Sequence, residues 1–339
     1  MADKKLRDVA DKAGVSLATA SLVLSGKGKI SQKVADRVRE SARLLGYKRK
    51  PGLSSKKKRD FKYIIILHYD TNFCLWNFSR PFITELESIL LDNHYYPIVI
   101  HMLPQLSTNE IIKEIKSSGA GAIFSMHYVN EPLFEQLENL GFPIIILNNS
   151  NFQKKFFSVL VDDYQGAYEG TTHLIELGHR NIVFAEYKRP EIPTVVTDRF
   201  LGFKKAMDEN NLGFTGDGRI SVELEDMEGL YERFAYIYSG KNPPTAVFVH
   251  DDYFAACVMV VLHKLGLKVP QDVSLIAPGD VLDYNQPFTP RITTMRINSS
   301  LMVKMAWELM MNRLETKPEE IHVVKIKQTL IDRGSSRPL

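Results

Sequence analysis

Apolar residues near the amino terminus recur at the spacing expected of α-helices. One helical face, with members three or four positions apart, consists of Leu6, Val9, Ala10 and Ala13. Gly14 interrupts this pattern with a residue that tolerates a positive φ, and Ser16 can cap a second helix. We expect that helix from about Leu17 to Leu24. Two short helices joined by a glycine-containing turn are typical of the helix-turn-helix motif.

A third helix is expected directly after Ser31, which is a suitable cap residue. Its apolar face consists of Val34, Val38, Ala42 and Leu45. Gly46 should end this helix, because glycine readily adopts the left-handed conformation found just past helix ends. The pattern therefore predicts a small all-α helix-turn-helix headpiece over residues 1–47.

From Phe61 onward, short apolar runs alternate with helical patterns. The run from Tyr63 to Leu67 has the composition of a strand buried on both faces. Further strands are expected at 97–101, 122–125, 143–147, 182–185, 219–222, 246–249 and 273–277, and helices at 81–93, 109–118, 131–140, 165–177, 199–210, 229–238 and 253–265. This alternation predicts parallel sheets wrapped by helices, and the length favours two α/β lobes with a ligand cleft between them.

Charge is divided unevenly along the chain. Residues 1–60 carry 17 Lys and Arg against 6 Asp and Glu, whereas the whole chain of 339 residues carries 43 and 40. A basic part with a net charge of +11 therefore precedes an acidic remainder with a net charge of −8. Clustered cations with Pro51 and Gly52 mark residues 48–61 as a basic linker to a ligand-binding body at 62–339.

The second predicted helix has a small outer face that suits the major groove of DNA. This face consists of Leu17, Ala18, Ser21 and Leu22. The hydroxyl groups of Ser16, Thr19 and Ser25 can donate to phosphates, and Lys27 and Lys29 add positive charge beyond the helix. A generic helical bundle with a solvated basic face is the alternative, but the turn chemistry, the small face and the charge division together favour DNA binding.

Other features of the sequence argue against several classes of protein. Cys74 and Cys257 lie far apart without a CxxC motif, so we expect neither a disulfide framework nor a metal site. No apolar run approaches the roughly 18 residues of a membrane helix, and no signal-peptide core follows Met1, so we expect a cytoplasmic protein. The motifs HExxH, GxSxG and GxGxxG and the P-loop pattern do not occur, so we expect no enzymatic activity and no cofactor.

The run DVADKAGVSLATASLVLSGKGKIS, together with VRESARLLGY, is similar to the headpiece of the LacI/GalR (lac-repressor) family of bacterial transcription regulators. In that family the first residues of the second helix read bases, which implicates Leu17, Ala18 and Leu22. Leu22 can offer a base only an apolar contact, for example to a thymine methyl group. The resemblance implies double-stranded operator DNA as a partner and a homodimer that matches a two-fold operator.

The linker departs from the pattern that the resemblance implies. In the family this segment forms a hinge helix on the operator and inserts a Leu into the minor groove. Ungapped alignment places Lys56 at that position, and Leu53 is the nearest apolar candidate. Either Leu53 inserts in a shifted register, or the linker only contacts phosphates through its basic run 56–59. We favour phosphate contacts, because Pro51 and Gly52 disfavour a helix there.

The resemblance continues through the body in short segments. VDDYQGA at 161–167 is similar to the family's DN-x-x-G, DRFLGF at 198–203 to its R-x-x-GF, and PTAVFVHDD at 244–252 to its PTAxxxxND. It implies a body like the periplasmic sugar-binding proteins, with chain crossovers near Val161, Pro290 and Ile321. Lobe 1 is expected at about 62–161 and 290–320, and lobe 2 at about 162–289 and 321–339.

Effector-binding side chains are expected where strands end, because the carboxyl ends of strands in open α/β sheets point at the crevice. This rule and the resemblance together select Phe73, Trp76, Asn77, Asn148, Arg199, Asp252 and Asp280. By resemblance, Arg199 donates a fork of hydrogen bonds to the effector and Asp252 accepts from its hydroxyl groups. The alternatives are interlobe packing for the aromatic residues and a surface helix cap for Arg199.

The resulting hypothesis is a transcriptional repressor whose operator affinity is switched by a small effector, a sugar or related metabolite, bound between the lobes. The first cleft helix and the methionine-rich helix from Met302 to Met311 are candidate dimer contacts, with core packing as the alternative for the second. The carboxylate pairs at 162–163 and 251–252 do not indicate catalysis, because sequence neighbours usually point apart. A solute-sensing protein with a degenerate DNA-binding head, acting through protein contacts, remains the alternative function.

Overall fold

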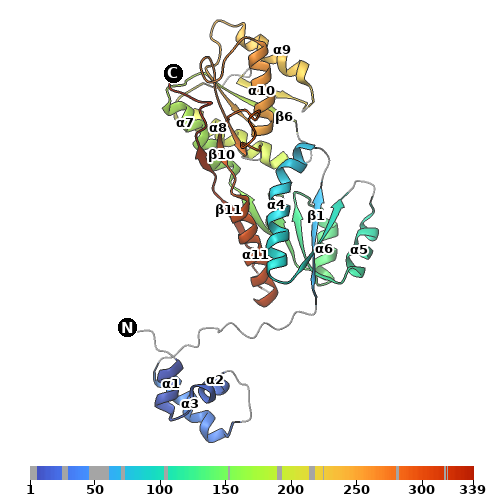
Figure 1. Cartoon of the computed structure of the whole chain (residues 1–339), viewed down its shortest axis with the longest axis vertical. Coiled ribbons are helices and arrows are strands. Elements are labelled where there is room, and N and C mark those ends of the chain that lie inside the picture. Colours follow the sequence, from blue (N-terminus) through green and yellow to red (C-terminus); the bar gives the residue numbers. More distant parts are fainter. Residues whose placement is uncertain are drawn as a thin grey trace. The chain divides into compact units, whose positions relative to one another are not determined.

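The computed structural model describes residues 6–24, 30–45, 61–69, 73–102, 106–151, 153–188, 193–213, 218–223, 225–279, 282–316, 318 and 320–339 (Figure 1). The chain divides into two compact units, Met1–Asp60 and Phe61–Leu339. We call the first unit the head and the second the body, and each is described by itself.

In its described residues the head forms helices α1 (Leu6–Ala13), α2 (Leu17–Leu24) and α3 (Gln32–Leu44). Gly14 ends α1 with a φ of +62°, a conformation that glycine adopts without steric cost. Its N–H donates to the Asp11 carbonyl at 3.2 Å, and the Val15 N–H donates to the Ala10 carbonyl at 3.1 Å. These two bonds form a Schellman motif, so the predicted turn between the first two helices is confirmed.

The core of the head consists of small aliphatic residues, namely Val9, Ala10, Ala13, Ala20, Val23, Ala35, Val38 and Ala42. In α3 the structure differs from the predicted face, because Ala35 is buried and Val34 is only half-buried. Ser31 occupies the cap position as predicted, but its side chain makes no capping hydrogen bond. The backbone carbonyl of Ser31 instead accepts the N–H groups of Val34 and Ala35, both at 3.0 Å.

Lobe 1 of the body is a parallel six-stranded sheet in the order β11-β5-β4-β3-β1-β2. Its strands are β1 (Tyr63–Tyr69), β2 (Tyr96–Met102), β3 (Ala120–Met126), β4 (Ile144–Leu147), β5 (Phe157–Val161) and β11 (Val323–Ile326). The helices of the lobe are α4 (Phe73–Asp92), α5 (Thr108–Ser117), α6 (Glu131–Asn139) and α11 (Ser299–Thr316). Helices α4 and α11 share one apolar cluster with this sheet, and α5 and α6 share another with the alternate residues of the same strands. The central strands are apolar along their length because both faces are covered.

Lobe 2 is a second six-stranded sheet in the order β12-β10-β9-β8-β6-β7. Its strands are β6 (Ile182–Tyr187), β7 (Arg219–Val222), β8 (Ala246–Val249), β9 (Ser274–Gly279), β10 (Thr293–Arg296) and β12 (Thr329–Ile331). Its helices are α7 (Asp163–Glu176), α8 (Pro193–Glu209), α9 (Met227–Tyr238) and α10 (Asp252–Lys264). The edge strand β12 runs antiparallel to β10, and the other strand pairs are parallel.

The chain crosses between the lobes after β5, after β10 and after β11. The first crossover lies near Val161 as expected, but the other two lie later than Pro290 and Ile321. Strand β10 still pairs with β9, with Thr293 opposite Ile276, so this segment belongs to lobe 2. Strand β11 still pairs with β5, with Val323 opposite Ser158, so that segment belongs to lobe 1. The lobe boundaries are thus set by pairing between strands that lie far apart in the sequence. A local sequence pattern carries no information about such pairing.

Two helices begin earlier than the pattern predicted. Helix α4 begins at Phe73 and contains Pro81, where we expected its start. Proline removes one backbone donor within a helix, so it weakens α4 locally, yet the helix continues to Asp92. Helix α8 begins at Pro193 rather than at Arg199. Arg199 therefore lies well inside α8, where its long side chain can reach the strand ends.

The methionine-rich helix contributes to the core of lobe 1. Met302 and Met310 on α11 are fully buried, and Met305 packs against the same cluster. Core packing, the alternative interpretation of these methionines, accounts for the buried ones. Among the described residues, no helix combines the length and the apolar character that a membrane span requires.

Candidate functional site

The start of α2 is capped as the sequence predicted. The Thr19 N–H donates to the Ser16 Oγ at 3.1 Å, and the hydroxyl groups of these two residues lie 2.9 Å apart. The Ala20 N–H donates to the Ser16 carbonyl at 3.0 Å. Ser16 is exposed and Thr19 is half-buried, so the predicted phosphate-binding hydroxyl of Ser16 lies at the surface of the head.

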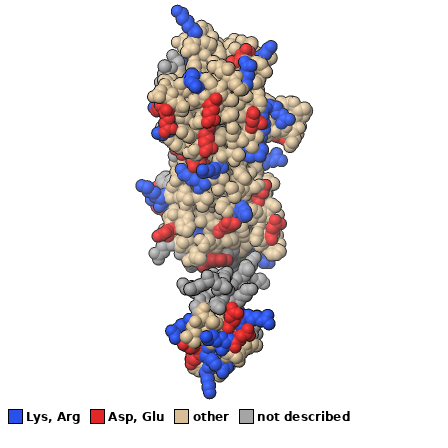
Figure 2. All heavy atoms as spheres, turned by 90° about the vertical axis from the view of Figure 1, so that its left-hand side faces the viewer, with Lys and Arg blue, Asp and Glu red and all other residues tan. Residues whose placement is uncertain are grey.

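On the face of the head seen in Figure 2, Lys and Arg side chains lie beside acidic ones. The exposed cations of its described residues are Arg7, Lys12, Lys33, Arg37, Arg39 and Arg43. Arg39 and Arg43 each lie within ion-pair distance of an acidic residue three positions earlier, at 3.6 and 2.7 Å. The other predicted DNA contacts on α2 are Leu17, Ala18, Ser21 and Leu22, whose side chains lie outside the described part of the chain. Ser25, Lys27, Lys29, Leu53 and Lys56 also lie outside the described residues.

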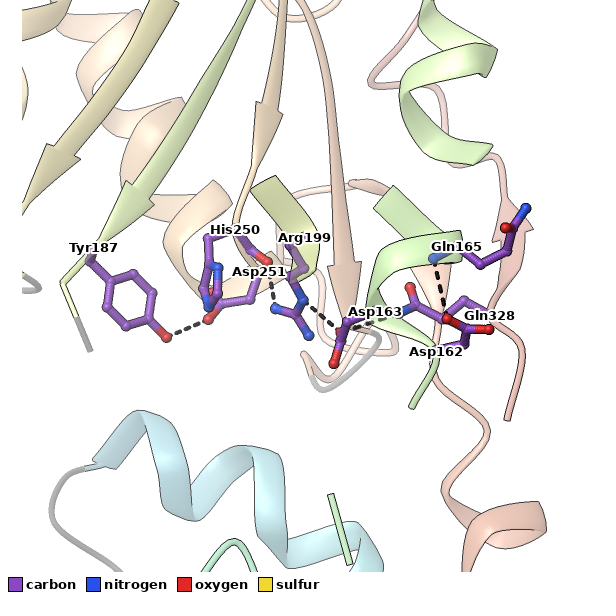
Figure 3. A network of polar contacts seen from close by, with 8 residues as sticks. All are labelled: Asp162, Asp163, Gln165, Tyr187, Arg199, His250, Asp251 and Gln328. Atoms are coloured by element: carbon purple, nitrogen blue, oxygen red, sulfur yellow. Dashed lines mark hydrogen bonds and ion pairs between the residues drawn. The ribbon is translucent and has the colours of Figure 1, made fainter. Parts of the chain in front are cut away.

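The polar side chains of lobe 2 meet at the carboxyl end of its sheet (Figure 3). Arg199, on α8, has an exposed fraction of 3%. Its Nε donates to the Asp163 Oδ1 at 2.7 Å, and its Nη1 donates to the His250 carbonyl oxygen at 2.6 Å. Asp163 is the first residue of α7, and His250 follows β8 directly. Arg199 therefore joins α7, α8 and the end of β8, and the interpretation of this residue as a surface helix cap is wrong.

Both helices that start beside Arg199 are capped by aspartates. The Asp162 side chain accepts the Gln165 N–H at the start of α7, at 3.3 Å. The Asp251 side chain accepts the Phe254 N–H at the start of α10, at 2.7 Å. The phenol of Tyr187 donates to the other carboxylate oxygen of Asp251. In each pair of neighbouring aspartates, 162–163 and 251–252, the first residue thus caps a helix and the second is buried.

Asp252 lies deeper than the sequence suggested. It has an exposed fraction of 0%, and its Oδ2 accepts the Leu282 N–H at 3.3 Å. Gly279 passes so close that a Cβ at this position would lie 2.5 Å from the Asp252 Oδ1. Asp252 thus contacts the end of β9 and the backbone of Leu282, and its side chain is not exposed in this structure.

The facing end of lobe 1 carries amide and imidazole groups. Asn148, directly after β4, is 5% exposed and has a φ of +52°. Its carbonyl oxygen lies 3.1 Å from the His127 Nδ1, and the Asn149 side chain donates to the His127 carbonyl at 2.7 Å. These contacts join the ends of β3 and β4, and they hold Asn148 in a conformation that asparagine tolerates better than most residues.

Residues from both lobes line a small hollow that is open to solvent. Its lining consists of Asn148, Ser150, Leu160, Val161, Asp163, Val195, Asp198 and Lys325. Asn148 and Lys325 come from lobe 1, whereas Asp198 comes from α8 of lobe 2. Of the residues predicted from the sequence, Asn148 thus contributes to the hollow directly and Arg199 contributes through its bond to Asp163.

Burial is the main influence on the pKa values of the two carboxyl groups at the hollow. Burial raises the pKa of the Asp198 carboxyl, and the nearby Asp163 raises it further, while Lys325 acts in the opposite direction. Burial likewise raises the pKa of the Asp163 carboxyl, and Arg199 opposes this rise. A raised pKa means that the charged form of each carboxylate is less favourable here than in water.

The sequence did not select Asp163, Asp198 or Lys325 as site residues. Asp163 belongs to a carboxylate pair that the sequence does display, and its position at a helix start was the available indication. Asp198 precedes Arg199 directly, but the start predicted for α8 at Arg199 left it outside the helix. Lys325 lies on β11, which the pattern did not predict to return to lobe 1.

The remaining predicted effector residues give less information. Phe73, Trp76 and Asn77 lie in the first turns of α4, but their side chains are not among those the structure describes. Asp280 lies outside the described residues.

Two family models match the chain. Residues 5–50 match the bacterial regulatory proteins of the lacI family, and residues 171–336 match a periplasmic binding protein-like domain. Among curated relatives, the chain is 26% identical to the HTH-type transcriptional repressor PurR of Pectobacterium atrosepticum, over 97% of this chain and 96% of that protein. The PurR repressor of Edwardsiella ictaluri shows the same identity and coverage.

Solved structures share the fold. The complex of the transcriptional regulator CelR with cellobiose has a TM-score of 0.68 at 18% identity and covers 98% of this chain and 100% of that chain. A LacI family regulator from Enterococcus faecium with bound ribose has a TM-score of 0.67 at 22% identity, over 81% of this chain and 99% of that chain. The lac repressor dimer bound to operator and the anti-inducer ONPF has a TM-score of 0.66 at 16% identity, over 99% of this chain and 100% of that chain.

Proposed function

The chain belongs to the lacI family of bacterial regulatory proteins, and from this premise we propose that a small effector bound between its lobes switches its affinity for operator DNA. The protein is a sequence-specific DNA-binding transcriptional regulator of the repressor type. Its head supplies the DNA contacts, and its body supplies the effector site. An effector changes operator binding by as much as its affinity differs between the two conformations of the body, typically about 1–3 kcal/mol.

The observation that carries the proposal is the hollow lined from both lobes. Asn148 reaches it from lobe 1 and Asp198 from lobe 2, so a ligand that bonds to both restrains the lobes relative to each other. Arg199 and Asp163 lie at its lobe 2 side in a buried and bonded arrangement. Polar groups that converge from two sides, as here, can fix the orientation of a small molecule.

We propose a sugar or related hydroxyl-rich metabolite as the effector. Carboxylate and amide oxygens accept hydrogen bonds from hydroxyl groups, and Asn148, Asp163 and Asp198 offer such oxygens. Two similar structures contain cellobiose and ribose, which supports the same ligand class for this chain. No cofactor is part of this proposal.

We further propose a homodimer that acts on DNA in the cytoplasm. One short helix contacts few bases, so a specific operator requires two heads related by two-fold symmetry. The lac repressor structure with a similar fold is a dimer bound to its operator, which supports this assembly.

A gel-shift titration on the intergenic DNA beside the gene tests the proposal. We expect one specific palindromic fragment to bind with steep salt dependence, and an effector from a thermal-shift screen to change that affinity. Arg199→Ala should abolish both the thermal shift and the change in operator affinity. A protein that binds a sugar but no DNA fragment would instead be a solute sensor that acts through protein contacts.

A further inference from the structure

Lobe 2 contains the two kinds of group that proteins ordinarily use to bind anions. One is an arginine, whose planar fork matches carboxylate and phosphate oxygens. The other is the helix N-terminus, where free N–H groups and the helix dipole attract negative charge. Arg199 and the starts of α7 and α10 lie together at the carboxyl end of the sheet (Figure 3).

The protein's own carboxylates already occupy these groups. Asp163 takes the Nε–H of Arg199 at 2.7 Å, and the two side chains are only 4% and 5% exposed. Asp162 caps α7 and Asp251 caps α10 through their side-chain oxygens. An incoming anion would therefore find both helix starts and the arginine already neutralised by bonds within the protein.

The hollow contains a second carboxylate, that of Asp198, in addition to the one that neutralises Arg199. Asp163 and Asp198 face it together with a single described cation, Lys325. The raised pKa of Asp198, caused by burial and then by Asp163, agrees with a site that disfavours additional negative charge. A phosphate placed here would lose its hydration and face two carboxylates, whereas a hydroxyl group would donate to them.

We propose that the effector of this protein carries no anionic group, and that Asp163 is the residue that excludes anions by neutralising Arg199. This inference rests on the proposed function, and it narrows the effector to uncharged hydroxyl-rich compounds. Sugar phosphates and sugar acids are then poor ligands, although they share the hydroxyl groups of the parent sugars. Asp163 thus determines the preference for uncharged over anionic ligands, and it does so by neutralising Arg199.

Asp163→Asn in the full-length protein tests the role of the carboxylate. The change keeps the size of the side chain and removes the charge that neutralises Arg199. We expect affinity for inorganic phosphate, measured by calorimetry, to rise at least about tenfold, because a charge-assisted hydrogen bond of ordinary strength supplies such a factor. Asp208→Asn is the matched control, since it removes one carboxylate from the exposed side of α8, where Asp208 pairs with Lys204.

The outcomes of this comparison are distinct. Gain of phosphate affinity in Asp163→Asn but not in Asp208→Asn supports the proposal. A folded Asp163→Asn protein, judged by circular dichroism, that gains no phosphate affinity overturns it, as does an equal gain in both variants.

A second measurement uses the unchanged protein and does not depend on the folding of a variant. Thermal-shift titrations compare ribose, cellobiose and their phosphate esters, together with gluconate. We expect no anionic compound to bind more tightly than its neutral parent. Tighter binding of a phosphate ester than of the parent sugar overturns the inference, whatever the variants do.

Operator titrations distinguish a failure of this inference from a failure of the proposed function, in which an effector switches operator affinity. If an anionic ligand binds and changes operator affinity, the inference fails and the proposed function stands. If a neutral ligand binds in preference to its anionic forms but leaves operator affinity unchanged, the inference stands and the proposed switching fails.

Discussion

The head and the ligand-facing end of lobe 2 use charge in opposite ways. In the head, Arg43 pairs with Glu40 at 2.7 Å while the side chains remain 73% and 53% exposed. In lobe 2, Arg199 pairs with Asp163 at the same distance, but these side chains are 4% and 5% exposed. Water and ions screen the first pair and leave Arg43 able to respond to DNA phosphates, whereas burial makes the second pair a fixed part of the fold.

Two ion pairs of the same length thus contribute differently to the free energy of unfolding. Exposed ion pairs typically contribute about 0–1 kcal/mol. Removing one partner of a buried pair costs about 3–5 kcal/mol, because the other charge remains buried without compensation. Charge changes in the head should therefore affect DNA binding more than stability, and charge changes at the buried Arg199–Asp163 pair should affect stability as well as ligand binding.

The largest effect is expected from Arg199→Ala. It leaves the Asp163 carboxylate buried without its cation, so the body should lose about 3–5 kcal/mol of unfolding free energy in urea denaturation. Arg43→Ala is the matched control in the head and should leave the stability of the body unchanged. Equal stability of the body in the two variants would contradict the contrast drawn here.

Val38→Ala should destabilise the head and leave the stability of the body unchanged. Val38 is 0% exposed on α3, and losing its two methyl groups from this small core should cost about 2 kcal/mol. We expect operator binding to weaken while the thermal shift caused by an effector stays unchanged. Leu44→Ala, at a position that is 59% exposed, is the control and should alter neither measurement. Loss of effector binding in Val38→Ala would show that the two units do not fold independently.

The pH dependence of stability should have opposite signs at two carboxylates. The pKa of Asp198 is raised by burial, so its charged form destabilises the fold as the pH rises through that pKa. Asp198→Asn should therefore be more stable than the parent protein near neutral pH, with the difference vanishing in acid. The pKa of Glu209 is lowered by bonds from Lys205 and Tyr168, so Glu209→Gln should be less stable near neutral pH and equal in acid. Urea unfolding across this pH range measures both differences, and the same sign for both would refute the assignment.

The smallest effect is expected in the linker. If its basic run only contacts phosphates, Leu53→Ala should leave operator affinity and DNA bending nearly unchanged. Lys56→Ala should instead lower the salt dependence of binding by about one unit of slope, because each phosphate contact releases about one counterion. A large loss of affinity and bending in Leu53→Ala would establish that this leucine inserts between base pairs.

The sequence predicts the head better than the ligand site because the two regions depend on contacts of different range. Gly14, Ser16 and the aliphatic face of α1 act within one or two turns of helix, so their pattern predicts the observed motif. Strand and helix alternation likewise predicts the two sheets.

The ligand site could not be predicted to the same degree. The place of β11 in lobe 1 depends on its pairing with β5, which lies far away in the sequence. The bond between Arg199 and Asp163 likewise joins two helices that follow different strands. The family resemblance selected Arg199 as a candidate site residue, and this stays a prediction. Its partner Asp163, its position inside α8 and the burial of Asp252 required the structure.

The most direct test of the account is selection of DNA from a random duplex pool by the full-length protein, followed by anisotropy titration of the selected duplex at several salt concentrations. We expect a two-fold symmetric sequence whose affinity falls steeply with salt and changes when an uncharged effector is added. Failure to enrich any duplex even at low salt would contradict the central claim that this protein is a DNA-binding regulator controlled from its body.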